Sequence, residues 1–149
     1  MGHIEGVQLT PQKIIELPAG NVLHVLKNHE ASFNGFGEAY FSTVNYNSPK
    51  GWKRHRKMTL NVVVPVGTIK FVLFDNRVES KTYQQLQEVV LSKDNYQRLT
   101  VPSGVWMAFK GMTEGLNMLL NIADILHDPE ETDNLPLENN IIPYTGFTK

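Results

Sequence analysis

The feature of this sequence that most constrains its fold is the regular alternation of short apolar runs with turn residues. Residues 59–66 and 69–74 are two such runs, and Gly67 and the pair Asp75-Asn76 close them. Runs of this length, rich in β-branched residues and bounded by Gly, Pro, Asn or Asp, are typical of β-strands. Counting them along the chain predicts about eight or nine antiparallel strands, and therefore an all-β domain.

Helical periodicity is confined to residues 81–87 and 129–133. Residues 116–126 are rich in Leu, but Gly115 before them and Asp128-Pro129 after them fit a buried strand at least as well. Many short strands with little helix indicate a sandwich, a jelly roll or a small barrel.

No repeat or long linker divides the 149 residues, so we expect one domain over 1–149, with residues 1–6 as a loose end. The chain has no Cys, which excludes disulfide scaffolds, thiolate metal sites and thiol nucleophiles. It contains no secretory signal pattern and no long apolar stretch. We therefore expect a cytoplasmic protein without a membrane partner.

The net charge of −1 hides two unlike regions. Cations crowd into residues 50–57, and acidic residues fill the segment 124–138 without any Lys or Arg between them. Like charges are usually spaced apart unless an anion compensates them, so the cationic segment predicts an anionic ligand; a solvated basic turn is the alternative. Nucleic-acid binding is not expected, because no recognised motif accompanies the patch. The cations are Lys50, Lys53, Arg54, Arg56 and Lys57.

Two segments resemble the paired half-motifs of the cupin superfamily. The first is residues 50–58, which lead into a strand closed by Gly67, and the second begins at Pro102-Ser103-Gly104. The resemblance implies a double-stranded β-helix, or jelly roll, of antiparallel strands with little helix. In metal-binding cupins the motifs carry His-x-His, Glu and a further His, and here Lys53, His55, neutral residues and Met107 take those places.

This set of side chains is unsuited to iron or manganese, because an ammonium group is a poor ligand and a thioether is a soft one. The remaining histidines have no ligand spacing with His55. We therefore expect a cupin with no metal and no other cofactor.

Among metal-free cupins, residues 36–131 are similar to the dTDP-4-dehydrorhamnose 3,5-epimerases and the dTDP-sugar 3,4-ketoisomerases. Ketoisomerases carry Arg-Gly-x-His-Ala-His-Lys-Lys, which aligns in register with residues 50–57; epimerases carry Lys-Gly-x-x-Arg-Gly-x-His, which matches Lys50, Gly51 and Arg54. The chain departs from the epimerase pattern at two places. Lys57 stands where the epimerases have their catalytic His, and the position of the Tyr that acts as their acid falls at or near Leu120.

The resemblance implies an isomerase that epimerises or keto-isomerises a nucleotide-linked 4-keto-6-deoxysugar in surface-polysaccharide precursor synthesis. The alternative is a catalytically degenerate cupin that binds a sugar nucleotide without turnover. Both parent reactions need a base beside a carbon next to the ketone. His55 is our candidate for the base, because an ordinary imidazole is mostly in its neutral form at pH 7. Lys53 is a second candidate, because neighbouring cations favour its neutral form.

Strand alternation separates these cations into two groups. Lys53, His55 and Lys57 would project from one face of a strand, and Arg54 and Arg56 from the other. The guanidinium groups suit a diphosphate because they pair with it bidentately, and lysines would bind it as point charges.

We expect further substrate contacts around this segment. Tyr40 and Trp106 are candidates to stack on a base or sugar, although each also fits the core. Asn61 could hydrogen-bond a sugar hydroxyl or satisfy buried backbone. We also expect a homodimer, since an exposed edge strand favours pairing and the similar family members are dimers. The predicted substrate-binding set is Lys50, Arg54, Arg56, Lys57, Tyr40, Asn61 and Trp106.

Overall fold

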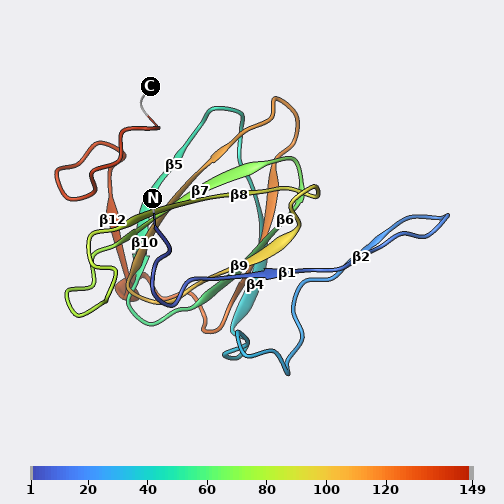
Figure 1. Ribbon diagram of the computed structural model, residues 1–149, viewed down its shortest axis with the longest axis horizontal. Helices are drawn as coiled ribbons and strands as arrows, with labels where there is room; N and C mark the ends of the chain where they lie inside the picture. The colour runs from blue at the N-terminus through green and yellow to red at the C-terminus, as the bar shows by residue number, and fades with distance from the viewer. Residues whose placement is uncertain (1, 148–149) are drawn as a thin grey trace.

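The computed structural model describes residues 2–147, which form two five-stranded antiparallel sheets and a small hairpin (Figure 1). The first sheet has the order β1 (Gln8–Pro11), β9 (Gln97–Val101), β6 (Leu60–Val66), β11 (Met118–Ala123), β4 (Glu38–Thr43). The second has the order β12 (Thr132–Leu135), β5 (Lys50–His55), β10 (Val105–Gly111), β7 (Ile69–Asp75), β8 (Leu86–Leu91). The hairpin consists of β2 (Ile14–Ile15) and β3 (Val22–Leu23), and a short 3₁₀ helix η1 spans Pro129–Glu131.

The chain crosses repeatedly from one sheet to the other between β4 and β12, which is the arrangement of a jelly roll. The prediction of an all-β jelly roll with little helix is therefore confirmed. Within residues 2–147, no helix has the length and hydrophobicity needed to cross a membrane. The count of eight or nine strands was too low, because it left out β5, which is cationic rather than apolar, and the short strand β12, and it did not separate all the short strands before residue 26. Residues 81–85 form turns that lead into β8, whereas η1 lies inside the segment 129–133.

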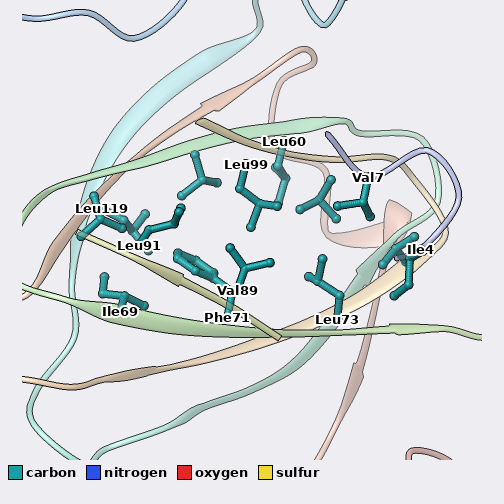
Figure 2. Close-up of a cluster of buried hydrophobic side chains, with 14 of the residues drawn as sticks. Ile4, Val7, Leu60, Ile69, Phe71, Leu73, Val89, Leu91, Leu99 and Leu119 are labelled. Atoms are coloured by element: carbon teal, nitrogen blue, oxygen red, sulfur yellow. The ribbon is translucent and has the colours of Figure 1, made fainter. Parts of the chain in front are cut away.

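The main hydrophobic core lies between the two sheets and draws on the inward residues of both (Figure 2). Phe71 and Leu73 of β7 belong to this core together with Leu60, Leu99 and Leu119 of the opposite sheet. Burial of such side chains is the main favourable contribution to folding. One end of the space between the sheets is left for polar side chains, as described below.

A second apolar cluster covers the outer face of the β12–β5–β10–β7–β8 sheet. Trp52 of β5, Phe74 of β7 and Trp106 of β10 are buried there beneath Ile142 and Phe147 of the C-terminal segment. Because side chains alternate along a strand, residues next to these three face the space between the sheets.

Gly67 and Gly104 allow the turns that both halves of the motif need. Gly67 joins β6 to β7 with a φ of 74°, and a Cβ there would collide with the carbonyl oxygen of Leu116. Gly104 precedes β10 with a φ of 88°, and its backbone N donates to the carbonyl of His55 at 2.7 Å. That bond ties the two motif segments together at one end of the barrel.

The amino-terminal residues differ from the loose end that we expected over 1–6. Ile4 is fully buried in the main core, and its backbone N donates to the side chain of Gln87 at 2.9 Å. The backbone N of Gly2 donates to the carbonyl of Leu86 at 3.2 Å. A single apolar side chain among polar neighbours gave no periodic signal, which is why the sequence did not indicate this packing; Met1 lies outside the described residues.

We predict that Ile4→Ala lowers the free energy of unfolding by about 2–5 kcal/mol, the usual cost of truncating a buried aliphatic side chain. Urea unfolding followed by tryptophan fluorescence measures it. Ile141→Ala is the matched control, because Ile141 is 46% exposed and its truncation should change stability by less than about 0.5 kcal/mol. Equal, small effects of both variants would show that residues 2–6 do not contribute to the core.

Candidate functional site

A pocket of about 220 Å³ lies between the sheets at the end where β5 and β10 face β4 and β11. Its floor is apolar, and its polar groups come from β4, β5 and β11. The lining residues are Tyr40, Ser42, Lys50, Gly51, Lys53, His55, Met58, Leu60, Val62, Val101, Pro102, Val105, Met107, Phe109, Leu119 and Asn121. An apolar cavity with a few convergent polar groups is the usual form of a small-molecule site.

The alternation expected along residues 50–57 is confirmed for the inward pair. Lys53 and His55 line the pocket, while Trp52 and Arg54, which alternate with them along β5, belong to the outer face. A register shift between β5 and β10, at Met107/Phe109, also brings Lys50 to the pocket. The structure thus brings together Lys50, Lys53, His55 and, from β4, Tyr40.

His55 is paired with a carboxylate that the sequence did not reveal as its partner. Its Nδ1 is in hydrogen-bond contact with Oε1 of Glu131, at the end of η1. Glu131 is buried, and its Oε2 accepts from the backbone N of Lys57 and Met58 at 3.1 and 3.2 Å. Burial raises the pKa of Glu131, but hydrogen bonds from His55 and the two backbone N–H groups outweigh it and lower the pKa below its ordinary value.

An ionised carboxylate only accepts hydrogen bonds, so His55 Nδ1 is the protonated nitrogen of this pair. In the neutral form of the ring, which lines the pocket, Nε2 is then the nitrogen with the free lone pair. Glu131 fixes the orientation of the ring, and its negative charge stabilises the imidazolium that forms when Nε2 takes up a proton. The pair is therefore equipped to act as a base.

Arg54 and Arg56 are not placed at the pocket, in contrast to the diphosphate role that we expected for them. Both donate to Asp133 on β12, with shortest distances of 2.8 Å for Arg54 and 2.7 Å for Arg56. Arg54 also lies 4.7 Å from the ring centre of Trp106 on the outer face. The anion that compensates these two cations is thus a carboxylate of the same chain.

Three other predicted contacts also lie away from the pocket walls. Lys57 follows the end of β5, where the chain bends and the strand alternation stops. Trp106 points to the outer cluster because Val105 and Met107 take the inward positions of β10. Asn61 is buried and satisfied: its Oδ1 accepts from Arg98 and Thr100, and its Nδ2 donates to the carbonyl of Ser32.

The two lysines of the pocket differ in their contacts. Lys50 Nζ donates to Ser42 Oγ of the opposite sheet at 3.0 Å and lies 5.9 Å from the ring centre of Phe109. Lys53 has no carboxylate partner within the described part of the chain. Uncompensated positive charge beside a pocket favours an anionic ligand.

Tyr40 and Asn121 form a further polar pair on the wall opposite His55. Asn121 Nδ2 donates to the hydroxyl of Tyr40 at 2.8 Å, across the β4–β11 pairing. Asn121 is buried, and its Oδ1 has no hydrogen-bond partner among residues 2–147. The sequence had suggested Tyr40 as a stacking residue and did not indicate Asn121.

Sequence reasoning also missed Glu131 as the partner of His55, and Asp133 as the partner of Arg54 and Arg56. The signal was present as an acidic segment of the same chain with no cations of its own, complementary to residues 50–57. Within residues 2–147, no group of three or more His, Asp or Glu side chains could hold a metal ion. The expectation of a site without a metal or other cofactor stays a prediction.

A sequence model of the dTDP-4-dehydrorhamnose 3,5-epimerases matches residues 3–142. The chain belongs to this family. A solved member of similar structure is the dTDP sugar isomerase from Desulfovibrio desulfuricans G20, which is 38% identical, with a TM-score of 0.92 over 95% of this chain and 91% of that one. This chain and the Desulfovibrio protein therefore have the same jelly-roll fold.

Two other relatives of this epimerase-family chain are less similar in sequence. The probable low-salt glycan biosynthesis epimerase Agl13 of Haloferax volcanii is 25% identical over 135 residues, which cover 89% of this chain and 86% of the relative. The spore coat polysaccharide biosynthesis protein SpsL of Bacillus subtilis is 22% identical over 148 residues, 98% of each chain.

We predict that Asp133→Asn destabilises the protein by about 1 kcal/mol at neutral pH and that the difference disappears in acid. Hydrogen bonds from Arg56 and Arg54 lower the pKa of Asp133 from 3.8 to about 2. A depressed carboxyl pKa contributes stability that is complete above the unfolded value and is lost as the pH falls through the folded one. Urea unfolding of both proteins between pH 7 and pH 2 measures the difference.

The control for this prediction is Asp94→Asn, which changes an exposed carboxylate in the turn before β9. Its effect should be small at every pH. A stability difference for Asp133→Asn that stays constant from pH 7 to pH 2 would contradict the ion-pair account.

Proposed function

We propose that this protein is a sugar-nucleotide epimerase acting on a 4-keto-6-deoxysugar linked to a nucleoside diphosphate. The observation that carries the proposal is the His55–Glu131 pair on the wall of an otherwise apolar pocket, in a chain of the dTDP-4-dehydrorhamnose 3,5-epimerase family. We favour epimerisation over keto-isomerisation because the matching family model is that of the epimerases.

The chemistry follows from the acidity of a C–H bond beside a ketone. His55 Nε2 accepts the proton, and Glu131 stabilises the imidazolium that results. The apolar floor of the pocket excludes water and strengthens the attraction between these charges. Lys53, which we also considered as a base, is better suited to bind anions, because it lacks a partner comparable to Glu131.

Lys50 and Lys53 are the cations that we assign to the diphosphate. Both line the pocket, whereas Arg54 and Arg56 are held on the outer face by Asp133. We take dTDP as the first nucleotide to test, because the names of the family and of the Desulfovibrio protein contain it. The glycan and spore-coat polysaccharide names of the two relatives support a place in surface-polysaccharide precursor synthesis. We also propose that the protein acts in the cytoplasm.

We also propose that the protein is a homodimer. The β2–β3 hairpin extends away from both sheets (Figure 1), and Leu17 and Val22 on it are 52% and 46% exposed. An isolated two-stranded hairpin is marginally stable in water. Phe41 on the edge strand β4 is exposed as well. A second copy of the chain would cover these apolar groups and support the hairpin.

We predict that the protein, incubated with dTDP-4-keto-6-deoxyglucose in D₂O, incorporates deuterium at C3 or C5 and forms an epimer. His55→Asn should lower the rate of epimer formation by about 10²–10⁴-fold, because it removes the base. Glu131→Gln should lower it by a smaller factor, because it removes only the charge that orients the base. NMR and mass spectrometry follow both products. His127→Asn, which changes an exposed histidine outside the pocket, should keep the full rate.

Absence of exchange with this substrate and with the corresponding UDP, GDP and CDP ketosugars would contradict the epimerase proposal. Thermal stabilisation by dTDP without exchange would instead establish the alternative, a cupin that binds a sugar nucleotide without turnover. This alternative is supported by Met107, which lines the pocket at the position where the second motif of the epimerases has a histidine.

We predict that light scattering at micromolar concentration gives twice the mass of the 16.9 kDa chain. The double variant Leu17→Asp, Val22→Asp should give a monomer, because it places charges where the apolar contact would form. Leu126→Asp, at an exposed residue outside both the hairpin and β4, is the control and should remain dimeric. A monomeric wild-type protein would refute the dimer.

A further inference from the structure

We propose that Tyr40 supplies the acid of the reaction from strand β4, and that Asn121 of the adjacent strand β11 positions its hydroxyl. The inference rests on the proposed function and goes beyond it, because the sequence analysis gave Tyr40 only a stacking role. In the epimerases that the sequence resembles, the acidic Tyr falls at or near Leu120 of this chain, where no proton donor is present.

Tyr40 and His55 lie on opposite walls of the pocket. Inversion at a carbon requires the proton to leave from one face and to return on the opposite face. His55 stands on β5 in one sheet, whereas Tyr40 and Asn121 stand on β4 and β11 in the other. All three line the same pocket, so the base and the phenol approach a bound sugar from opposite walls.

Asn121 and Tyr40 are hydrogen-bonded to each other. Asn121 Nδ2 donates to Tyr40 Oη at 2.8 Å, which leaves the phenolic proton free for another acceptor. An N–H group that donates to the phenol oxygen also stabilises the negative charge left after proton transfer. Tyr40 is 49% exposed, so solvent can return the proton.

Asn121 is an energetically unfavourable residue at a buried position unless its side chain has a role there. Its side chain is buried and its Oδ1 has no hydrogen-bond partner in the described part of the chain, a loss that an apolar residue at this position would avoid. On β11 the pocket-lining residues are Leu119 and Asn121, and Leu120 is not among them. Retaining a polar side chain that holds the Tyr40 hydroxyl is explained by a role in positioning.

The other donors of the pocket are less suited to this step. Ser42 is an alcohol, a much weaker acid than a phenol, and its Oγ accepts from Lys50. Lys50 extends from β5 to Ser42 of the opposite sheet, at 3.0 Å, but we assign its ammonium group to the diphosphate. Lys53 lies on β5, the strand that also carries His55. Among the described lining residues, Tyr40 is the donor that combines sufficient acidity with the opposite side.

The step balances with these two groups alone. His55 Nε2 takes the proton from the carbon beside the ketone, and the C–H electron pair forms the C=C bond of an enolate. The Tyr40 O–H bond then breaks, its proton forms the new C–H bond on the opposite face, and the ketone is restored. Solvent protonates the phenolate and removes the proton from His55, so that no external oxidant or reductant is required.

The test compares two products of one reaction in D₂O, with dTDP-4-keto-6-deoxyglucose as the probe. Tyr40→Phe should lower epimer formation by about 10²–10⁴-fold. Deuterium incorporation into recovered, uninverted substrate should persist within about tenfold, because His55 can still remove a proton and return a deuteron on its own face. Asn121→Leu should lower the ratio of epimer to exchanged substrate in the same direction, with KM for the probe little changed.

Tyr83→Phe is the matched control, because Tyr83 is 40% exposed and lies outside the pocket. It should leave both products unchanged. An active wild type together with a Tyr40→Phe variant that forms epimer at the normal rate would overturn this inference alone. Equal loss of epimer and exchange in Tyr40→Phe would also overturn it, since a binding or structural role lowers both. Wild-type protein that exchanges nothing overturns the proposed function, and this inference with it.

Discussion

The pairing of β12 with β5 is the interaction on which the rest of the site depends. It sets Thr132 opposite His55 and Asp133 opposite Arg54, so that an acidic segment late in the chain lies against the cationic one. Glu131, just before β12, reaches His55 from the end of η1. A buried carboxylate without partners would cost several kcal/mol. Here it accepts from His55 and from two backbone N–H groups, which makes the arrangement stable.

The same pairing separates two electrostatic functions that are adjacent in the sequence. On the outer face Asp133 forms ion pairs with both Arg54 and Arg56, whereas on the inner face Lys53 lines the pocket without a carboxylate partner in the described part of the chain. The pocket therefore has cationic groups without a carboxylate partner, although two arginines of the same segment are paired with Asp133. Because the facing sheet supplies Tyr40 and Asn121, the two walls differ in chemistry: a carboxylate-backed imidazole on one side and a phenol on the other.

The local pattern of the sequence predicted much of this fold but little of its long-range pairing. Turn-bounded runs predicted the strands, and alternation along β5 placed Lys53 and His55 on one face and Arg54 on the other. The prediction failed at Lys57, because β5 ends at His55 and alternation holds only within a strand. It also assigned Arg54 to a ligand, since nothing within residues 50–57 shows that β12 will supply Asp133.

The account's central claim is that the pocket between the sheets, rather than the outer cationic face, receives the nucleotide sugar. A crystal structure of the protein with dTDP tests this most directly. The account predicts the diphosphate within hydrogen-bond distance of Lys50 or Lys53, on the same side of β5 as His55. A nucleotide bound instead to Arg54 and Arg56, with Asp133 displaced from them, would contradict it.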